Sequence, residues 1–189
     1  MATPENGFRN LTDGETAMLK KLFGTSIPYE DVKIYNRKWT RLQDDERAVA
    51  PNGNIYIPPG TWFEEDFSKA DPENKHNFMH EMAHVWQYHR AGLLGVVVPG
   101  IKSALGFGYG YKLDPEKTLA DYSLEGQADI LADYYFEKFE GGSACSRSVG
   151  NCGTLNEYEI VLKDFLANQN NKENFAKPPS TDPLSDYRF

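Results

Sequence analysis

The sequence predicts an α+β fold, with short strands in the first third of the chain and helices in the remainder. Three observations predict it: β-prone stretches with turn signals before residue 60, a long helix that begins at Pro72, and two later helical segments. With 189 residues, the chain suits one domain that buries about 70% of its unfolded surface. We expect that domain to span residues 1–167 and an irregular tail, rich in Asn, Lys and Pro, to span 168–189.

Local signals mark the first helix and a hairpin after it. Thr12 as N-cap, with Glu15 three residues later, predicts a capping box, and Gly24 supplies the stop. Further along, the turn signal Pro51-Asn52-Gly53 separates two apolar triplets, at 48–50 and 55–57. This pattern predicts a β-hairpin.

The later helices are marked by capping residues and glycines. The longest is predicted to begin at Asp71-Pro72, to run to about Arg90 and to end at Gly92. The apolar run Leu93–Val98 that follows predicts a buried strand or loop. Two further helices are expected, over about residues 124–139, closed by Gly141-Gly142, and over about 156–167.

Charge and hydropathy limit the partners that the chain can have. Lys and Arg number 20 against 28 Asp and Glu, and the net charge of -8 has the wrong sign for a phosphate backbone. Nucleic acid is therefore excluded as the main partner. No stretch approaches the ~20 apolar residues that span a bilayer, and the start lacks the basic and apolar regions of a signal peptide. We expect neither a transmembrane segment nor a signal peptide.

Cys145 and Cys152 lie seven residues apart in a segment rich in Gly and Ser. The spacing fits a small disulfide loop or two free thiols, and it lacks the CxxC pattern of a metal or redox site. A disulfide would imply an oxidising compartment.

The motif His80-Glu81-Met82-Ala83-His84 lies inside the predicted long helix. Residues four apart share one face of a helix, so both imidazoles can bind one ion. Tetrahedral Zn²⁺, with bonds of about 2.0–2.1 Å to nitrogen, accepts such a pair. Glu81 then lies beside the metal, where it can take a proton from the attacking water and pass it to the leaving amine. We expect one bound Zn²⁺.

A surface helix that carries the motif by chance is the alternative. Against it, apolar residues cover two faces of this helix, which predicts burial. They are Phe78, Met79, Met82, Ala83, Val85 and Trp86. Because a buried glutamate and two buried histidines need partners, a metal site is favoured over a hydrogen-bonded core pair.

The third protein ligand is expected from another element. His76 lies about 12 Å along the helix axis from His84, and His89 lies about 140° round the helix from it, so both are expected to be surface or helix-end residues. Glu125 and Asp129, four apart on a later helix, share a face. We expect Glu125 to bind the metal and Asp129 to orient a ligating imidazole.

Together, the HExxH motif at 80–84 and the ExxxD pattern at 125–129 resemble the gluzincin metallopeptidases. The resemblance implies a zincin-like fold, in which a short β-sheet packs on the zinc-binding helix and further helices follow. It also implies that Glu125 is the third zinc ligand and that Asp129 supports the first histidine of the motif.

Segments outside the motif, at 11–15, 54–57 and 78–88, are similar to zincin-type toxin domains found at the C-terminus of type VI secretion spike (VgrG) proteins. This similarity implies an antibacterial effector, secreted without a signal peptide, that acts in the periplasm of a target cell. Its expected partners are a protein or peptide substrate, an immunity protein and a secretion spike.

Thermolysin-like enzymes have a further histidine that stabilises the oxyanion, but no histidine follows His89 in this chain. Tyr109, Tyr111 and Tyr122 are the candidate donors in its place, although each fits a packing role as well. The strand at 54–57 is a candidate edge for pairing with an extended peptide.

Two other functions fit the same residues. One is a cell-wall amidase, because the Gly- and Tyr-rich segment 106–111 suits a sugar-peptide site as well as a protein groove. The other is a non-catalytic module, stabilised by zinc, that binds a partner. A structural zinc needs four protein ligands and no base, so Glu81 favours the hydrolase over this module.

Overall fold

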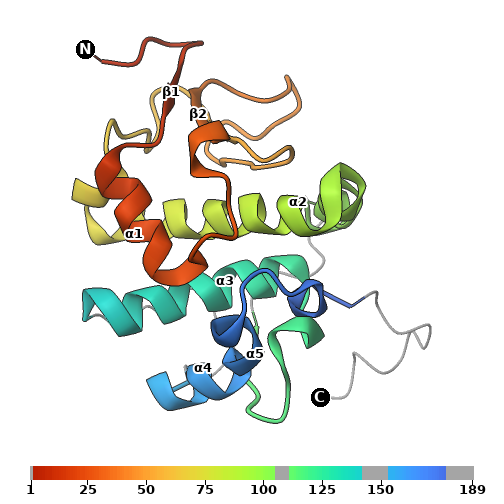
Figure 1. Ribbon diagram of the computed structural model, residues 1–189. Helices are drawn as coiled ribbons and strands as arrows, with labels where there is room; N and C mark the ends of the chain where they lie inside the picture. Colours follow the sequence, from red (N-terminus) through yellow and green to blue (C-terminus); the bar gives the residue numbers. More distant parts are fainter. Residues whose placement is uncertain (1, 105–110, 142–152, 178–189) are drawn as a thin grey trace.

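The computed structural model describes residues 2–104, 111–141 and 153–177. Two long helices, α2 (Pro72–Ala104) and α3 (Leu124–Tyr135), pack against each other at the centre. A small sheet lies on one side of α2, and α4 (Leu155–Val161) and α5 (Lys163–Ala167) lie on the far side of α3 (Figure 1). This mixture of strands and helices confirms the α+β prediction, and the zincin-like assignment stays a prediction.

The sheet has three short strands in the order β1-β2-β3. Strand β1 (Phe8–Asn10) pairs antiparallel with β2 (Lys33–Asn36), which pairs parallel with β3 (Ile55–Ile57). The predicted hairpin is present, but its pairing is a single bridge between Val49 and Tyr56. That bridge uses both the N–H and the C=O of Tyr56. The prediction that this strand offers an open edge is therefore wrong at Tyr56.

Helix α1 (Asp13–Phe23) begins and ends as predicted, with a capping box at Thr12 and Gly24 as C-cap. Glu15 does more than cap, since its side chain is fully buried. One oxygen accepts from Arg9 Nη2 at 2.7 Å and from the backbone N–H of Phe67 at 2.8 Å. The other accepts from Arg9 Nη1 and from the backbone N–H of Thr12, each at 2.8 Å. Glu15 thus ties β1, α1 and the segment before α2 together.

Glu15→Ala is expected to lower the free energy of unfolding by about 3–5 kcal/mol, because it leaves the largely buried Arg9 guanidinium without its carboxylate. Chemical denaturation monitored by circular dichroism measures this. Glu157→Ala is the matched control, since Glu157 completes a capping box on α4 at a partly exposed position. Equal losses for the two variants would show that the buried contacts of Glu15 add nothing to its capping role.

Helix α2 begins as predicted, with the Asp71 carboxylate accepting from the backbone N–H groups of Glu73 and Asn74. The six apolar residues that predicted its burial are all fully buried. At Gly92 the backbone leaves helical geometry, with φ of 71° and ψ of -178°, and the helix then resumes to Ala104. The prediction of a strand or loop at Leu93–Val98 is therefore wrong. The first helical segment therefore ends at Gly92 as predicted, and a second helical segment follows the kink and continues to Ala104.

Helix α3 continues into a π-helical turn, Phe136–Glu140, and ends at Gly141 with φ of 69°. The expected last helix is divided at Leu162 into α4 and α5. Residues 168–177 of the expected tail contact the helices: the N–H of Lys177 donates to the carbonyl of Ala120, for example. The boundary between domain and tail stays a prediction, and both cysteines lie outside the described residues. Within those residues, no helix combines the length and apolar content needed to cross a membrane.

Candidate metal centre

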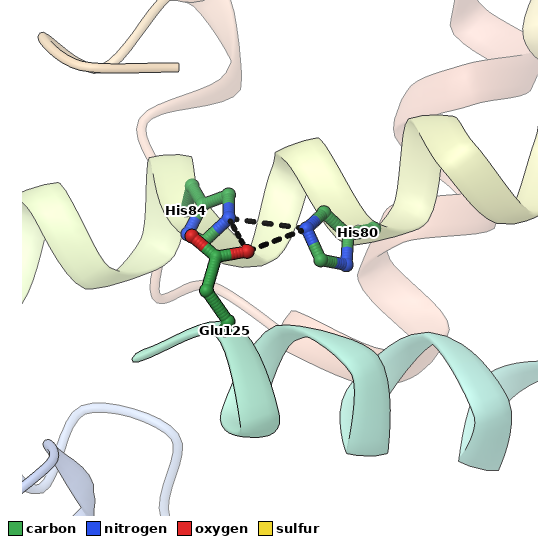
Figure 2. A group of neighbouring side chains, drawn as sticks. All are labelled: His80, His84 and Glu125. Atoms are coloured by element: carbon green, nitrogen blue, oxygen red, sulfur yellow. Dashed lines mark hydrogen bonds and ion pairs between the residues drawn. The ribbon is translucent and has the colours of Figure 1, made fainter. Parts of the chain in front are cut away.

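Three donor atoms from α2 and α3 converge at one point (Figure 2). The Nε2 atoms of His80 and His84 are 3.2 Å apart. Oε2 of Glu125 lies 3.4 Å from Nε2 of His80 and 3.6 Å from Nε2 of His84. Tetrahedral Zn²⁺ with bonds of about 2.0–2.1 Å requires donor separations of about 3.4 Å. The three measured separations lie close to that value.

The packing of two antiparallel helices positions these donors. His80 and His84 share one face of α2 because they are one turn apart, and this face packs against α3. Glu125 lies in the first turn of α3, where Ser123 caps the helix by accepting from the N–H of Gly126. A helix N-terminus favours an ionised carboxylate, so this location keeps Glu125 in the form that binds cations. Asp129, one turn further along α3, lies opposite His80.

An acceptor oxygen lies beside Nδ1 of each imidazole. Nδ1 of His80 lies 2.8 Å from Oδ1 of Asp129, and Nδ1 of His84 lies 2.7 Å from Oε1 of Gln87. An acceptor at Nδ1 stabilises the Nδ1–H tautomer, which leaves the lone pair on Nε2 for a metal. Asp129 thus contacts the imidazole that the resemblance assigned to it. Gln87 was missed by the sequence analysis, although its place one turn after His84 on an apolar helix was a signal.

These residues fit a zinc ion. Two neutral imidazoles would point their Nε2 lone pairs at each other and at a carboxylate, an arrangement that needs a cation or a proton between them. Two nitrogens and one carboxylate are also a donor set that zinc accepts in catalytic sites. In residues 2–104, 111–141 and 153–177, His80, His84 and Glu125 form the one group of three such donors within 4.8 Å of one another.

In the metal-free protein, protons take the place of the cation. Burial lowers the pKa of His80, but the contacts with Asp129 and Glu125 outweigh it and raise that pKa to about 10. The pKa of His84 is also raised, because Glu125 outweighs the effect of burial. For Glu125, burial raises the pKa, but the neighbouring His84 and His80 hold it well below its usual range. The metal-free centre is therefore protonated on imidazole at neutral pH.

We expect zinc affinity to rise with pH, because the ion must displace at least one proton from His80 and His84. Each displaced proton gives about a tenfold gain in affinity per pH unit below the raised pKa. Competition with a chelator at pH 6, 7 and 8 measures this slope. The stability of the metal-free fold has the opposite dependence on pH. Because folding raises the pKa of His80, its contribution to stability is complete below about pH 6.5 and is lost as the pH rises toward about 10. A zinc affinity that does not change with pH would contradict this account.

Glu81 lies next to His80 on α2, and only 9% of its surface is exposed. Its negative charge helps to raise the pKa of both His80 and His84, against the lowering by burial, but less than Asp129 and Glu125 do at His80 and less than Glu125 does at His84. The carboxylate is therefore close to the centre without belonging to the converging donors. That position suits a group that exchanges protons with a reacting molecule.

The three candidate oxyanion donors have different outcomes. Tyr109 lies outside the described residues. Tyr111 is buried and its hydroxyl donates to Oδ2 of Asp133 at 2.6 Å, about two turns of α3 away from Glu125. The hydroxyl of Tyr122 accepts from the backbone N–H of Asp114 at 2.8 Å. Both described hydroxyls thus have structural partners, and the oxyanion role of this set stays a prediction.

The two remaining histidines do not join the donors. Of the two predicted locations for His76, surface or helix end, the surface is wrong, because His76 lies near the start of α2 but is buried, with its Nε2 2.7 Å from Oδ1 of Asp133. His76 contacts Asp133, His80 contacts Asp129 and Glu125, and His84 contacts Glu125, so histidine–carboxylate contacts run along the helix pair. His89 is partly buried, and its pKa is lowered by burial and by Arg90.

Comparison with known proteins places the chain in a family. No protein-family model matches the chain. The type VI secretion system spike protein VgrG2b of Pseudomonas aeruginosa is 38% identical over 161 residues, which cover 83% of this chain and 15% of that protein. The solved effector domain of P. aeruginosa VgrG2b matches with a TM-score of 0.62 and 34% identity, over 76% of this chain and 84% of that domain. The chain belongs to the VgrG2b effector-domain family.

As a VgrG2b-type effector domain, the chain confirms the similarity to type VI spike-associated domains that the sequence suggested. It spans only 15% of the length of the spike protein that it matches. The match therefore concerns the effector domain, and the activity and partners of the whole spike protein do not transfer with it.

Proposed function

We propose that this VgrG2b-type effector domain is a zinc metallopeptidase. His80, His84 and Glu125 would hold one Zn²⁺, with Asp129 orienting His80. The observation that carries the proposal is the convergence of three donor atoms at separations of 3.2, 3.4 and 3.6 Å, beside a glutamate that is not one of them. Zinc in such a site polarises a carbonyl and makes water a nucleophile at neutral pH.

The protein's own groups then supply the proton transfers and the orientation. Glu81 takes a proton from the attacking water and gives it to the leaving amine as the peptide bond breaks. Asp129 and Gln87 hold the two imidazoles in place throughout. Three protein ligands, where a structural zinc takes four, leave room for substrate, and this supports the hydrolase over the non-catalytic zinc-stabilised binding module.

The biological role that fits is that of an antibacterial type VI effector. Membership of the VgrG2b effector-domain family supports delivery with a secretion spike. We place its action in the periplasm of the target cell, on a protein or peptide substrate, with an immunity protein protecting the producer. The alternative function is that of a cell-wall amidase, which would use the same residues and the same zinc chemistry.

Two substrates separate these readings. The purified protein, loaded with one equivalent of Zn²⁺, is incubated with an unstructured protein such as casein and with labelled peptidoglycan. New N-termini from casein support the peptidase, and release of labelled fragments from peptidoglycan alone supports the amidase. No cleavage of either, by a protein that binds zinc and is toxic, favours the binding module. Expression in bacteria with and without an export signal tests the location, with toxicity expected only for the exported form.

A further inference from the structure

Two fully buried glutamines connect His84 to the C-terminal segment of the chain. Gln87 on α2 and Gln127 on α3 have no exposed surface. Oε1 of Gln87 lies 2.7 Å from Nδ1 of His84, and Nε2 of Gln87 donates to Oε1 of Gln127 at 3.1 Å. Nε2 of Gln127 donates in turn to the backbone carbonyls of Leu119, at 2.9 Å, and Asn174, at 3.1 Å. A continuous path of hydrogen bonds thus links residue 174 to a metal-binding imidazole.

The direction of every bond in this path is determined. Backbone carbonyls only accept, so the NH₂ group of Gln127 must face Leu119 and Asn174, and its oxygen must face Gln87. The NH₂ group of Gln87 then faces two acceptors, Gln127 Oε1 and the carbonyl of Leu124 at 2.8 Å. Its oxygen is therefore left for His84, which must carry its proton on Nδ1 to complete the path.

We propose that Gln127 is a positioning residue for the metal centre, which acts through Gln87 to hold His84 with Nε2 directed at the ion. The inference rests on the proposed function, because it takes His84 as a metal ligand. It gives the two histidines different supports: the Asp129 carboxylate holds His80, whereas a pair of neutral amides holds His84. An amide can face either way, so the orientation of Gln87 depends on acceptors at its NH₂ group, which are Gln127 Oε1 and the carbonyl of Leu124, whereas a carboxylate needs none.

The carbonyl at the start of the path is itself held in place. Asn174 is buried, and its side-chain NH₂ donates to the carbonyl of Asn168 at 2.8 Å. Within the same segment, the carbonyl of Gln169 accepts from Nε1 of Trp86 on α2 at 3.0 Å. Residues 168–177 are therefore part of the support of the metal centre, through one backbone carbonyl that they present to Gln127.

Gln127→Met tests the proposal, because methionine is similar in size and has no group to donate or accept in this path. We expect its zinc affinity, measured by competition with a chelator, to fall by about 10–100-fold, as for other residues that support a ligand. In the zinc-loaded variant, the Nδ1–H resonance of His84 is expected to shift or to exchange faster, while that of His80 stays unchanged. A loss of packing alone would not select His84 over His80.

Tyr29→Phe is the matched control, since it removes one hydrogen bond, to the carbonyl of Gly24, away from the path. It is expected to lower stability without changing zinc affinity. A folded Gln127→Met protein with wild-type affinity and an unchanged His84 resonance overturns the proposal. Wild-type protein that binds no zinc overturns the proposed function instead, so the two failures are distinguishable.

If Gln127→Met does not fold, a zinc titration of the wild-type protein tests the proposal instead. On addition of zinc, the side-chain NH₂ resonances of Gln87 and Gln127 are expected to shift together, because both belong to one path that ends at a ligand. The NH₂ of Gln43, which donates to the carbonyls of Arg47 and Tyr56, is the control and is expected to stay unchanged. A resonance of Gln127 that zinc does not move also overturns the proposal.

Discussion

Glu81→Gln is expected to abolish hydrolysis while the protein keeps its zinc. Glutamine has the size and polarity of glutamate, but its amide cannot take a proton from the attacking water. Removing a general base typically costs about 10²–10⁴-fold in rate, and here the loss should appear in kcat. Peptide hydrolysis by the purified variant measures the rate, and elemental analysis measures the zinc content. Toxicity of the exported variant should be lost in parallel.

Glu73→Gln is the matched control, because Glu73 is exposed in the first turn of the same helix. It removes the same charge from α2 without approaching the metal centre, and it should keep both zinc and activity. If Glu81→Gln hydrolyses peptides at the wild-type rate, Glu81 is not the base. If it stays fully toxic, catalysis does not explain the toxicity and the binding module becomes the better reading.

The parts of the molecule that the sequence predicted well are those that depend on neighbours along the chain. The capping box of Thr12 and Glu15 needs only residues three apart, and it is present as predicted. The facing of His80 and His84 needs only helical geometry, which places residues four apart on one face. Their contacts with Glu125 and Asp129 were predicted from a second i,i+4 pattern, on a later helix, together with the family resemblance.

The parts that were missed depend on contacts between distant segments. His76 was expected at the surface or at the helix end, and its burial was missed because nothing on its own helix shows that Asp133 lies opposite it. Gln127 is one of many polar residues in the sequence, and only the positions of Gln87 and residue 174 give it a role. The helical segment after Gly92 was also missed, because a glycine with a positive φ ends a helix whether or not a second helical segment follows it.

Glu125→Gln is expected to remove zinc and activity together, which separates it from Glu81→Gln. The change replaces the one negatively charged donor of the centre by a neutral amide, so the affinity should fall further than the roughly 10–100-fold typical of residues that only support a ligand. Asp129→Asn should show that smaller loss. Chelator competition measures the zinc affinity of both variants. Glu116→Gln is the control, because Glu116 is exposed in the segment of the chain that connects α2 and α3.

The metal-free Glu125→Gln protein gives a second, independent readout. Glu125 is a principal cause of the raised pKa of His84 and contributes to that of His80, so its loss should lower both values. Histidine resonances followed against pH detect the change without any metal. Variant protein that binds zinc as wild type does, with lowered histidine pKa values, would mean that Glu125 neighbours the centre without binding the ion. Another carboxylate near the two imidazoles, with Glu81 as the first to test, would then have to be the third ligand.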